Sequence, residues 1–239
     1  MFLNKEKRSI ALAMILGDGC LHLTSNKASG AITIDHGLDQ VDYLTWKASL
    51  LSDIFNRNVR VRSGHRGKSV QVSIADRRLR SWRKFCYPGG KKSLIKTLRL
   101  IHTELDRTLA IWLMDDGYVE SSFTKNKNYS ASLRLFTCSE PFEGQELIVD
   151  WFKSKFNVSP KIKTLTKKST GKTYLFLKIN SGDSLIIWER IRETVLQFKS
   201  MQYKFRYLEE IYQKRLPQRT PSVHKTEDDI VGALGKPRE

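Results

Sequence analysis

An apolar segment that runs into an aspartate and a glycine occurs near the start of the chain and again near its middle. The first, "ALAMILGDG", ends at Gly19, and the second, "LAIWLMDDG", ends at Gly117. Each is apolar on nearly all sides, which is typical of a buried helix, and a glycine just past the last turn is a common helix end. Each segment is therefore predicted to be a buried helix that ends at an acid, Asp18 or Asp116.

Alternating and periodic segments follow the first helix in a regular order. The runs "CLHLT" and "AITIDHG" alternate apolar with polar residues on either side of the turn "TSNKASG", which predicts a β-hairpin. The segment "DQVDYLTWKASLLSDIF" has apolar residues at three- and four-residue spacing, as in an amphipathic helix. Two more alternating runs, "NVRVRSG" and "KSVQVSIA", precede the helical stretch "DRRLRSWRKFCY". The predicted order is αββαββα.

The second half of the chain repeats this order. After "MDDG" come a short strand, the loop "SSFTKNKN", the strand "YSASLRLFTCS" and the helix "FEGQELIVDWFKSKF". The strands "SPKIKTLTK" and "TYLFLKIN" and the helix "DSLIIWERIRETVLQF" complete the unit. The predicted class is α+β, with duplicated αββαββα units joined near "YPGG", which breaks the preceding helix. The expected division is a first unit at 1–90, a linker at 91–102, a second unit at 103–216 and a polar C-terminal tail at 217–239.

Composition adds a strong positive charge to this pattern. Lys and Arg number 42 against 25 Asp and Glu, a formal net charge of +17. Such an excess is typical of proteins with a polyanionic partner, first nucleic acid and second a membrane surface. No long uncharged apolar run and no signal-peptide pattern is present, so we expect a soluble, intracellular protein with no membrane partner. Whether its compartment is a bacterial or phage cytoplasm or an organelle stays open. The cysteines Cys20, Cys86 and Cys138 fit neither a disulfide framework nor a zinc site and are predicted to be buried thiols.

Each predicted strand has one polar face. A strand directs alternate side chains to opposite faces, so Arg60 and Arg62 lie opposite Val59 and Val61. Such faces commonly contact water. Several strands agree, however, in carrying side chains that hydrogen-bond to bases and phosphates, and a DNA major groove is wide enough for a β-ribbon. The candidate DNA-binding residues are His22, Thr33, Arg60, Arg62, Gln71, Ser73, Ser132, Arg134, Lys161, Lys163, Lys178 and Asn180.

The two aspartates occupy an unfavourable position. The carbonyl end of a helix is already partly negative, so an acid there requires compensating positive charge. A solvated Asp-Gly turn would explain one such acid, but both copies end the one helix that is too apolar to face water. Two such helices can bury their faces against each other, which would bring Asp18 and Asp116 together and favour a hard divalent cation such as magnesium. Paired acids also serve glycoside hydrolysis, but the basic sheets argue against a neutral sugar.

The two acid-ending helices resemble the signature motifs of a known family. "ALAMILGDG" and "LAIWLMDDG", with the doubled αββαββα order over residues 5–215, resemble the single-chain LAGLIDADG homing endonucleases. The resemblance implies that the motif helices pack at a pseudo-twofold interface and that two antiparallel, saddle-shaped sheets lie over DNA. It also implies that Asp18 and Asp116 bind metal ions, with the carbonyls of Gly17 and Asp115 as further ligands.

The same resemblance implies a basic residue near each active centre, which Lys92 in "GGKKSL" and Lys204 in "QYKFR" match. The implied cofactor is Mg²⁺, for which Mn²⁺ can substitute. The larger Ca²⁺ is expected to bind without supporting efficient cleavage. One departure concerns helix packing: Ala13 and Gly17 are small, whereas the matching positions of the second motif carry an isoleucine and an aspartate. We therefore expect an asymmetric interface.

The predicted function is a site-specific, metal-dependent double-strand break in a long DNA target, leaving 3′ overhangs. Because the chain holds both motifs, it is expected to act as a monomer, associated with an intron or an intein. One alternative is a group I intron RNA maturase of the same fold, which would bind its own intron RNA. Another is a non-catalytic DNA-binding regulator, but the tail is too short for an added recognition domain. The paired acids Asp18 and Asp116 favour the nuclease, since RNA binding alone does not require them.

Overall fold

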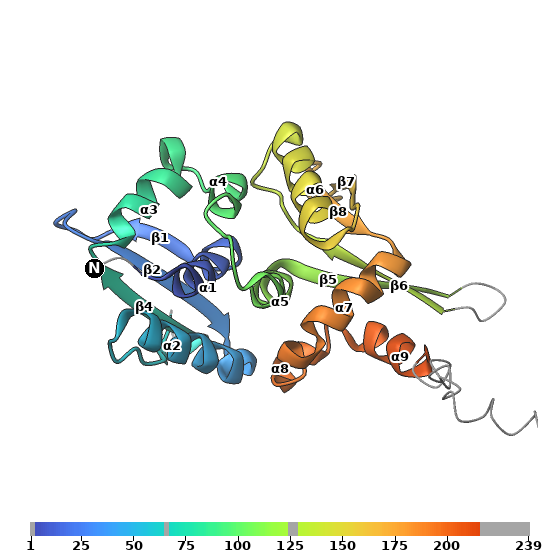
Figure 1. The fold of residues 1–239 in the computed structure, drawn as a ribbon, viewed down its shortest axis with the longest axis horizontal. Helices are drawn as coiled ribbons and strands as arrows, with labels where there is room; N and C mark the ends of the chain where they lie inside the picture. Colours follow the sequence, from blue (N-terminus) through green and yellow to red (C-terminus); the bar gives the residue numbers. More distant parts are fainter. Residues whose placement is uncertain (1–2, 65–66, 124–128, 216–239) are drawn as a thin grey trace, which may run out of the picture.

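Both halves of the chain contain the predicted order of helices and strands (Figure 1). The computed structural model describes residues 3–64, 67–123 and 129–215. The first half consists of α1 (Lys5–Leu16), β1 (Cys20–Leu23), β2 (Gly30–Gly37), η1 (Leu38–Gln40), α2 (Val41–Phe55), β3 (Arg62–Ser63), β4 (Ser69–Asp76), α3 (Leu79–Cys86) and η3 (Pro88–Gly90). The second half consists of α5 (Leu105–Asp116), β5 (Gly117–Phe123), β6 (Tyr129–Leu135), α6 (Phe142–Phe156), β7 (Lys161–Thr166), β8 (Thr173–Ile179), α7 (Ser181–Val195), α8 (Lys199–Gln202) and α9 (Arg206–Arg215).

Each half forms a four-stranded antiparallel sheet. The strand orders are β1-β2-β4-β3 and β5-β6-β8-β7, which are equivalent positions in the two units. The pairing is equivalent too, because Cys20 lies opposite Thr33 and Tyr118 lies opposite Arg134. The helices α2 and α6 both end at an asparagine in the left-handed region, Asn56 (φ 53) and Asn157 (φ 55). The duplicated α+β fold is therefore confirmed, and residues of the two halves can be matched one to one.

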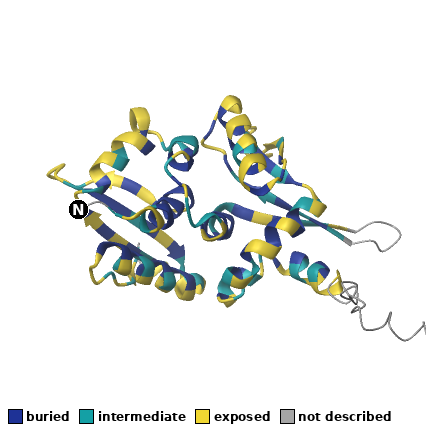
Figure 2. Cartoon of the chain, viewed as in Figure 1, coloured by how far each residue is buried: buried dark blue, intermediate teal, exposed yellow. Residues whose placement is uncertain are grey.

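The motif helices α1 and α5 lie side by side between the two sheets (Figure 1). Every residue from Ala11 to Leu16 and from Leu109 to Met114 is fully buried. In Figure 2 buried residues dominate the motif helices, whereas buried and exposed residues alternate along the strands. Burial of apolar side chains is the main force that joins the halves. The consequence for the site is that both acid-bearing helix ends lie at the junction of the halves.

The predicted linker is a packed element. It contains α4 (Leu94–Leu98), which begins at the cap residue Ser93 and buries Leu94, Thr97 and Leu98. The apolar spacing in "SLIKTLRLI" supplies the buried face. Residues 91–102 thus contain a packed helix, and the division of the chain into two units and a linker stays a prediction. The tail 217–239 lies outside the described residues.

Two strand assignments and two cysteine assignments need correction. The hydrogen-bonded part of β3 is short, so Arg60 precedes the strand, although its side chain is exposed as expected. Asn180 does not lie on a strand face, because its side chain accepts a hydrogen bond from the Asp183 amide and caps α7, a position that asparagine favours. Cys86 is buried, but the other two cysteines are exposed. Among the described helices, none combines the length and apolar character that crossing a bilayer demands.

Candidate active site

The two motif acids lie at the ends of α1 and α5: Asp18 follows the last turn of α1, and Asp116 is the last residue of α5. The amides of Gly17 and Gly19 close the end of α1 by donating to the carbonyls of Ala13 (3.3 Å) and Met14 (2.8 Å). In the second motif the Gly117 amide donates to the Leu113 carbonyl. A side chain at either closing glycine, Gly19 or Gly117, would overlap the backbone of the preceding turn. The glycines thus allow the chain to turn sharply from each buried helix into the first strand of its sheet.

The two motifs contact each other directly through Asp115. The Asp115 carboxylate crosses to the first motif, where it accepts a hydrogen bond from the backbone amide of Asp18 (3.0 Å). The carboxylate has room because residue 17 is a glycine. A Cβ atom at this position would overlap the carboxylate. The expected asymmetry of the helix interface is present, and its physical cause is this interlocking of Gly17 with Asp115.

A buried cluster from the first half holds the Asp115 carboxylate. The Lys47 ammonium donates to both of its oxygens (2.6 and 2.8 Å), and the Tyr43 hydroxyl donates to one of them (2.9 Å). The side chains of Lys47 and Asp115 are both completely buried. Burial raises the pKa of Asp115, but the Lys47 charge and the hydrogen bonds to this carboxylate together outweigh burial and hold that pKa below its ordinary value. Asp115 is therefore a buried anion with a buried counter-ion.

His36 on β2 completes this cluster. Burial and the Lys47 charge lower the pKa of His36 to about 4, so the ring is neutral at physiological pH. Its Nδ1 lies 2.9 Å from Gln40 Oε1, an acceptor, so Nδ1 carries the proton, and Nε2 accepts from Lys47 Nζ at 3.1 Å. The same Nδ1 is 3.7 Å from an Asp18 oxygen. His36 thus connects the Lys47 cluster to the first motif acid.

One combination of metal-ligating atoms is less suitable than it looks. Oxygens of Asp18 and Asp115 and a nitrogen of His36 lie within 4.8 Å of one another, which is close enough for a metal ion. The Asp115 carboxylate, however, already accepts hydrogen bonds from an ammonium, a hydroxyl and an amide. A cation there would also lie beside the Lys47 ammonium. This group of three is better explained as a structural ion-pair cluster.

The charges of the motif acids Asp18 and Asp116 are compensated only in part by the nearby lysines. Burial and the nearby Asp115 charge raise the pKa of Asp116 to about 7. Burial, followed by the Asp115 charge, also raises the pKa of Asp18. Carboxyl groups that are partly buried near other anions bind protons or metal cations in order to reduce repulsion. The electrostatics of this junction therefore favour a bound cation.

Two lysines approach the same helix ends. Lys92 Nζ donates to the Gly17 carbonyl, and Lys204 Nζ donates to the carbonyls of Met114 (2.5 Å) and Asp115 (3.0 Å). Burial lowers the pKa of both lysines, although the nearby acids oppose the shift. The structure thus brings together all the residues predicted to be catalytic or metal-binding. Their roles in a reaction stay predictions.

Sequence reasoning missed His36, Tyr43 and Lys47. One signal was available for Lys47, because it follows Leu44 by three residues and so falls on the apolar stripe of α2. In the second half the matching residues are Thr137, Gly144 and Ile148, so no equivalent charged cluster forms there. The two halves therefore share a fold but not the same junction chemistry.

Most candidate DNA-binding residues lie on the partly exposed sheet faces. His22, Arg62, Ser73, Lys161 and Lys163 are exposed, and Thr33, Gln71, Ser132, Arg134 and Lys178 are partly buried. Two hydrogen bonds cross the first of these faces, between Thr33 and Ser73 (3.2 Å) and from Gln71 to Asp35 (2.8 Å). The alternation of polar and apolar faces is thus as predicted, and contact with DNA stays a prediction.

One acid lies among the basic side chains of the second sheet. Glu120 on β5 accepts hydrogen bonds from Arg134 (3.1 Å) and Lys178 (2.9 Å). Hydrogen bonds from these two cations lower the pKa of Glu120 to about 2, so it is ionised throughout the working range. Arg134 and Lys178 therefore have part of their charge neutralised within the protein.

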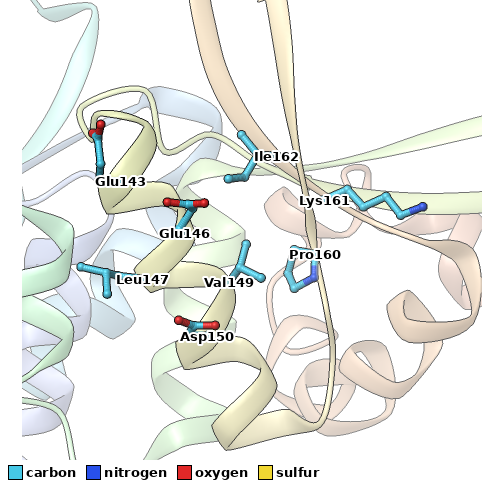
Figure 3. Close-up of a pocket in the computed structure, with 8 residues that line it drawn as sticks. All are labelled: Glu143, Glu146, Leu147, Val149, Asp150, Pro160, Lys161 and Ile162. Carbon is cyan, nitrogen blue, oxygen red and sulfur yellow. The ribbon is translucent and has the colours of Figure 1, made fainter.

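An open pocket on the second half is separate from this junction (Figure 3). It lies between α6 and the start of β7 and contains none of the motif acids or the two lysines. Its lining includes Glu143, Glu146 and Asp150, while the Lys161 side chain extends away from these acids (Figure 3). The pocket therefore has no part in the candidate active site.

The fold and site define a class of protein: two matched α+β halves joined by a pair of acid-ending helices. The model of the LAGLIDADG DNA endonuclease family matches residues 8–185, and the chain belongs to this family. It resembles the solved homing endonuclease I-WcaI bound to its DNA recognition sequence, with a TM-score of 0.60 and 19% identity over 85% of this chain and 87% of that chain. It also resembles the I-LtrWI LAGLIDADG homing endonuclease bound to target DNA, with a TM-score of 0.50 and 10% identity over 96% of each chain. These likenesses show the fold.

Curated relatives are similar in sequence over part of their length. Protein RecA from Mycobacterium gastri is 33% identical over 152 residues, which cover 61% of this chain and 35% of that protein. Protein RecA from Mycobacterium shimoidei is 27% identical over 210 residues, 84% of this chain and 47% of that protein. The chain thus spans between about a third and a half of the length of the curated relatives it matches.

Proposed function

We propose that this chain is a homing-type DNA endonuclease that hydrolyses one phosphodiester in each strand of a long duplex target and leaves 3′ overhangs. The observation that carries the proposal is the meeting of Asp18 and Asp116 at one junction, with Lys92 and Lys204 on the adjoining helix-end carbonyls. Family membership supports the same activity. We further propose that it acts as a monomer and that its gene accompanies an intron or an intein.

The residues at the junction fit a hard divalent cation. Asp18 and Asp116 supply carboxylate oxygens, and Gly17 and Asp115 supply carbonyl oxygens at the ends of helices. Magnesium prefers such oxygen donors, and the raised pKa of each motif acid reflects burial and then repulsion from Asp115, both of which a bound cation would offset. We propose Mg²⁺ as the cofactor, with Mn²⁺ as a substitute.

The chemistry divides between this cation and the protein. When bound, the cation lowers the pKa of an attacking water and stabilises charge on the attacking and leaving oxygens. We assign to Lys92 and Lys204 the role of donating hydrogen bonds to the phosphoryl oxygens as negative charge develops in the transition state. The buried Lys47–Asp115 pair holds the Asp18 backbone amide and so orients the first motif.

Sequence recognition is proposed for the exposed sheet faces. Arg60, Arg62, Lys161 and Lys163 form no ion pair among the described residues, so their charges are available to DNA. Loss of an arginine that reads a base should cost about 1–3 kcal/mol and relax preference at one position. Loss of a lysine that contacts a phosphate should weaken binding to all DNA sequences alike and reduce the salt dependence of binding. Unchanged site preference after substitution of all four would contradict this assignment.

A cleavage and binding assay on the same preparations tests the function. The substrate is a plasmid that carries the joined flanks of the gene's insertion site. Asp18→Asn and Asp116→Asn should each strongly reduce double-strand cutting in Mg²⁺, whereas the double variant should still bind the site in Ca²⁺. Asp150→Asn, an exposed acid on α6, serves as the matched control. A double variant that still cuts would show that the two aspartates are turn residues and would overturn the proposal.

A further inference from the structure

Each of the two active-site lysines lies on a short segment between two short helical elements near the end of its own half. Lys92 lies between η3 and α4, and Lys204 lies between α8 and α9. A lysine side chain is long and flexible, so the position of its ammonium depends on how firmly its backbone segment is held. In both cases an acid from the opposite half binds that segment.

Glu140, in the second half, binds the segment that carries Lys92. Its buried carboxylate accepts a hydrogen bond from the amide of Leu94, the first residue of α4 and two residues after Lys92. Residue 144, one turn along α6, is a glycine whose absent Cβ would lie 2.6 Å from Glu140 Oε2 and 3.1 Å from Glu140 Cβ. The glycine therefore leaves the space that the Glu140 side chain occupies.

Asp42, in the first half, binds the segment that carries Lys204. Its carboxylate in the first turn of α2 accepts a hydrogen bond from the Ser200 hydroxyl in α8. The segment is also held by packing, because the Phe198 ring lies 5.4 Å from the Tyr43 ring and 4.9 Å from the Trp46 ring of α2. Lys204 is attached to the end of this helix, because its backbone amide donates a hydrogen bond to the Met201 carbonyl in α8 (3.2 Å).

We propose that Glu140 and Asp42 are positioning residues that place the Lys92 and Lys204 ammonium groups from across the junction. The inference rests on the proposed function, because it assigns these acids a role through the two lysines. Each lysine reaches the helix end of its own half, Gly17 for Lys92 and Asp115 for Lys204, while its backbone is tied to the other half. Docking of the two halves thus sets both lysines at once.

The test measures single-turnover cleavage of each DNA strand separately, with a distinct label on each strand, in Mg²⁺. Lys92→Met and Lys204→Met first establish which strand each lysine serves. Glu140→Ala should then slow cleavage of the strand that Lys92→Met affects. Asp42→Ala should slow cleavage of the strand that Lys204→Met affects. The expected loss in each case is about 10- to 100-fold, because a small misplacement of a reacting group costs about that much in rate. Affinity for the target in Ca²⁺ should not change.

Two further variants separate positioning from folding. Glu140→Gln keeps an acceptor oxygen for the Leu94 amide, so it should restore most of the rate that Glu140→Ala loses. Gly144→Ala keeps the Glu140 charge but displaces the carboxylate, so it should slow the same strand as Glu140→Ala. Alanine favours a helix more than glycine does, so a strand-selective loss in this variant cannot come from a weaker α6. The control is Glu143→Ala, an exposed acid in the first turn of α6 (Figure 3). For Asp42→Ala the control is Asp39→Ala, an exposed acid in η1.

Two results would overturn the inference alone. In one, Glu140→Ala and Asp42→Ala slow both strands equally, as a general loss of structure would. In the other, both variants cut at the parental rate although the lysine variants are impaired. If Lys92→Met and Lys204→Met themselves cut both strands at the parental rate, the lysines have no role in the reaction, and the inference falls together with that part of the proposed function.

Discussion

Replacement of Asp116 by asparagine should stabilise the protein in the absence of divalent cations. Asparagine keeps the size of the side chain and removes its charge. In the folded protein, burial and the neighbouring Asp115 raise the pKa of Asp116 from 3.8 to about 7, and in the unfolded chain it ionises near 3.8. The folded state therefore resists the ionisation that the unfolded state undergoes readily.

The sign and size of the effect follow from this difference. Below pH 3.8 both states hold the proton, and the stabilising contribution of the protonated carboxyl is fully present. As the pH rises through about 7 the contribution is lost, because the unfolded chain releases the proton first. One pKa unit corresponds to about 1.36 kcal/mol, so the full loss is at most about 4 kcal/mol at pH 8. In a chain of this size, a change of 1 kcal/mol moves the melting temperature by about 2–4 °C.

Thermal unfolding in EDTA at pH 5 and pH 8 measures the effect. Asp116→Asn should melt higher than the parent at pH 8, by several degrees, with a smaller difference at pH 5. Addition of Mg²⁺ at pH 8 should raise the melting temperature of the parent more than that of the variant. Asp150→Asn, at an exposed position, should follow the parent. A variant that melts below the parent at pH 8 in EDTA would refute the reasoning, because it would mean that the Asp116 charge is already well compensated.

Three other predictions follow from the junction and the sheet. Lys47→Met should destabilise the fold by about 3–5 kcal/mol in chemical denaturation, since it leaves the buried Asp115 charge without its counter-ion, and Asp115→Asn in the same chain should recover part of the loss. Glu120→Gln should tighten DNA binding at low salt and steepen the salt dependence measured by fluorescence titration, because it releases Arg134 and Lys178; an unchanged slope would show that these cations do not face phosphates. Sedimentation with and without target DNA should show one chain per duplex, and a stable dimer on DNA would contradict the monomeric mode.

The fold could be predicted because local patterns decide it. The chain contains alternating apolar and polar runs typical of strands, apolar residues at three- and four-residue spacing typical of helices, and helices that end in an acid and a glycine. These patterns occur twice in the same order, so the duplicated units follow from the residues alone. Asp18 and Asp116 could be singled out because an acid is unfavourable at the end of an apolar helix. Lys92 and Lys204 came from the resemblance, since the chain holds many other lysines.

The buried cluster around Asp115 could not be predicted, because it depends on contacts between distant segments. A lysine in an amphipathic helix is usually solvated, and Lys47 is buried here because a carboxylate arrives from the other half through the space left by Gly17. Glu120 is a similar case, because its pairing with Arg134 and Lys178 requires the register of three strands. The pattern of apolar and polar residues shows which face of a helix or strand is buried. It does not show which side chains of distant helices and strands come into contact.

The interlocking of Gly17 with Asp115 also restricts which halves can assemble. A homodimer of the first half would bury two Lys47 ammonium groups with no carboxylate to receive them. A homodimer of the second half would place two Asp115 side chains where one glycine now makes room. Recombining halves from different relatives to reach a new DNA site therefore requires that Gly17, Lys47 and Asp115 be exchanged as a set.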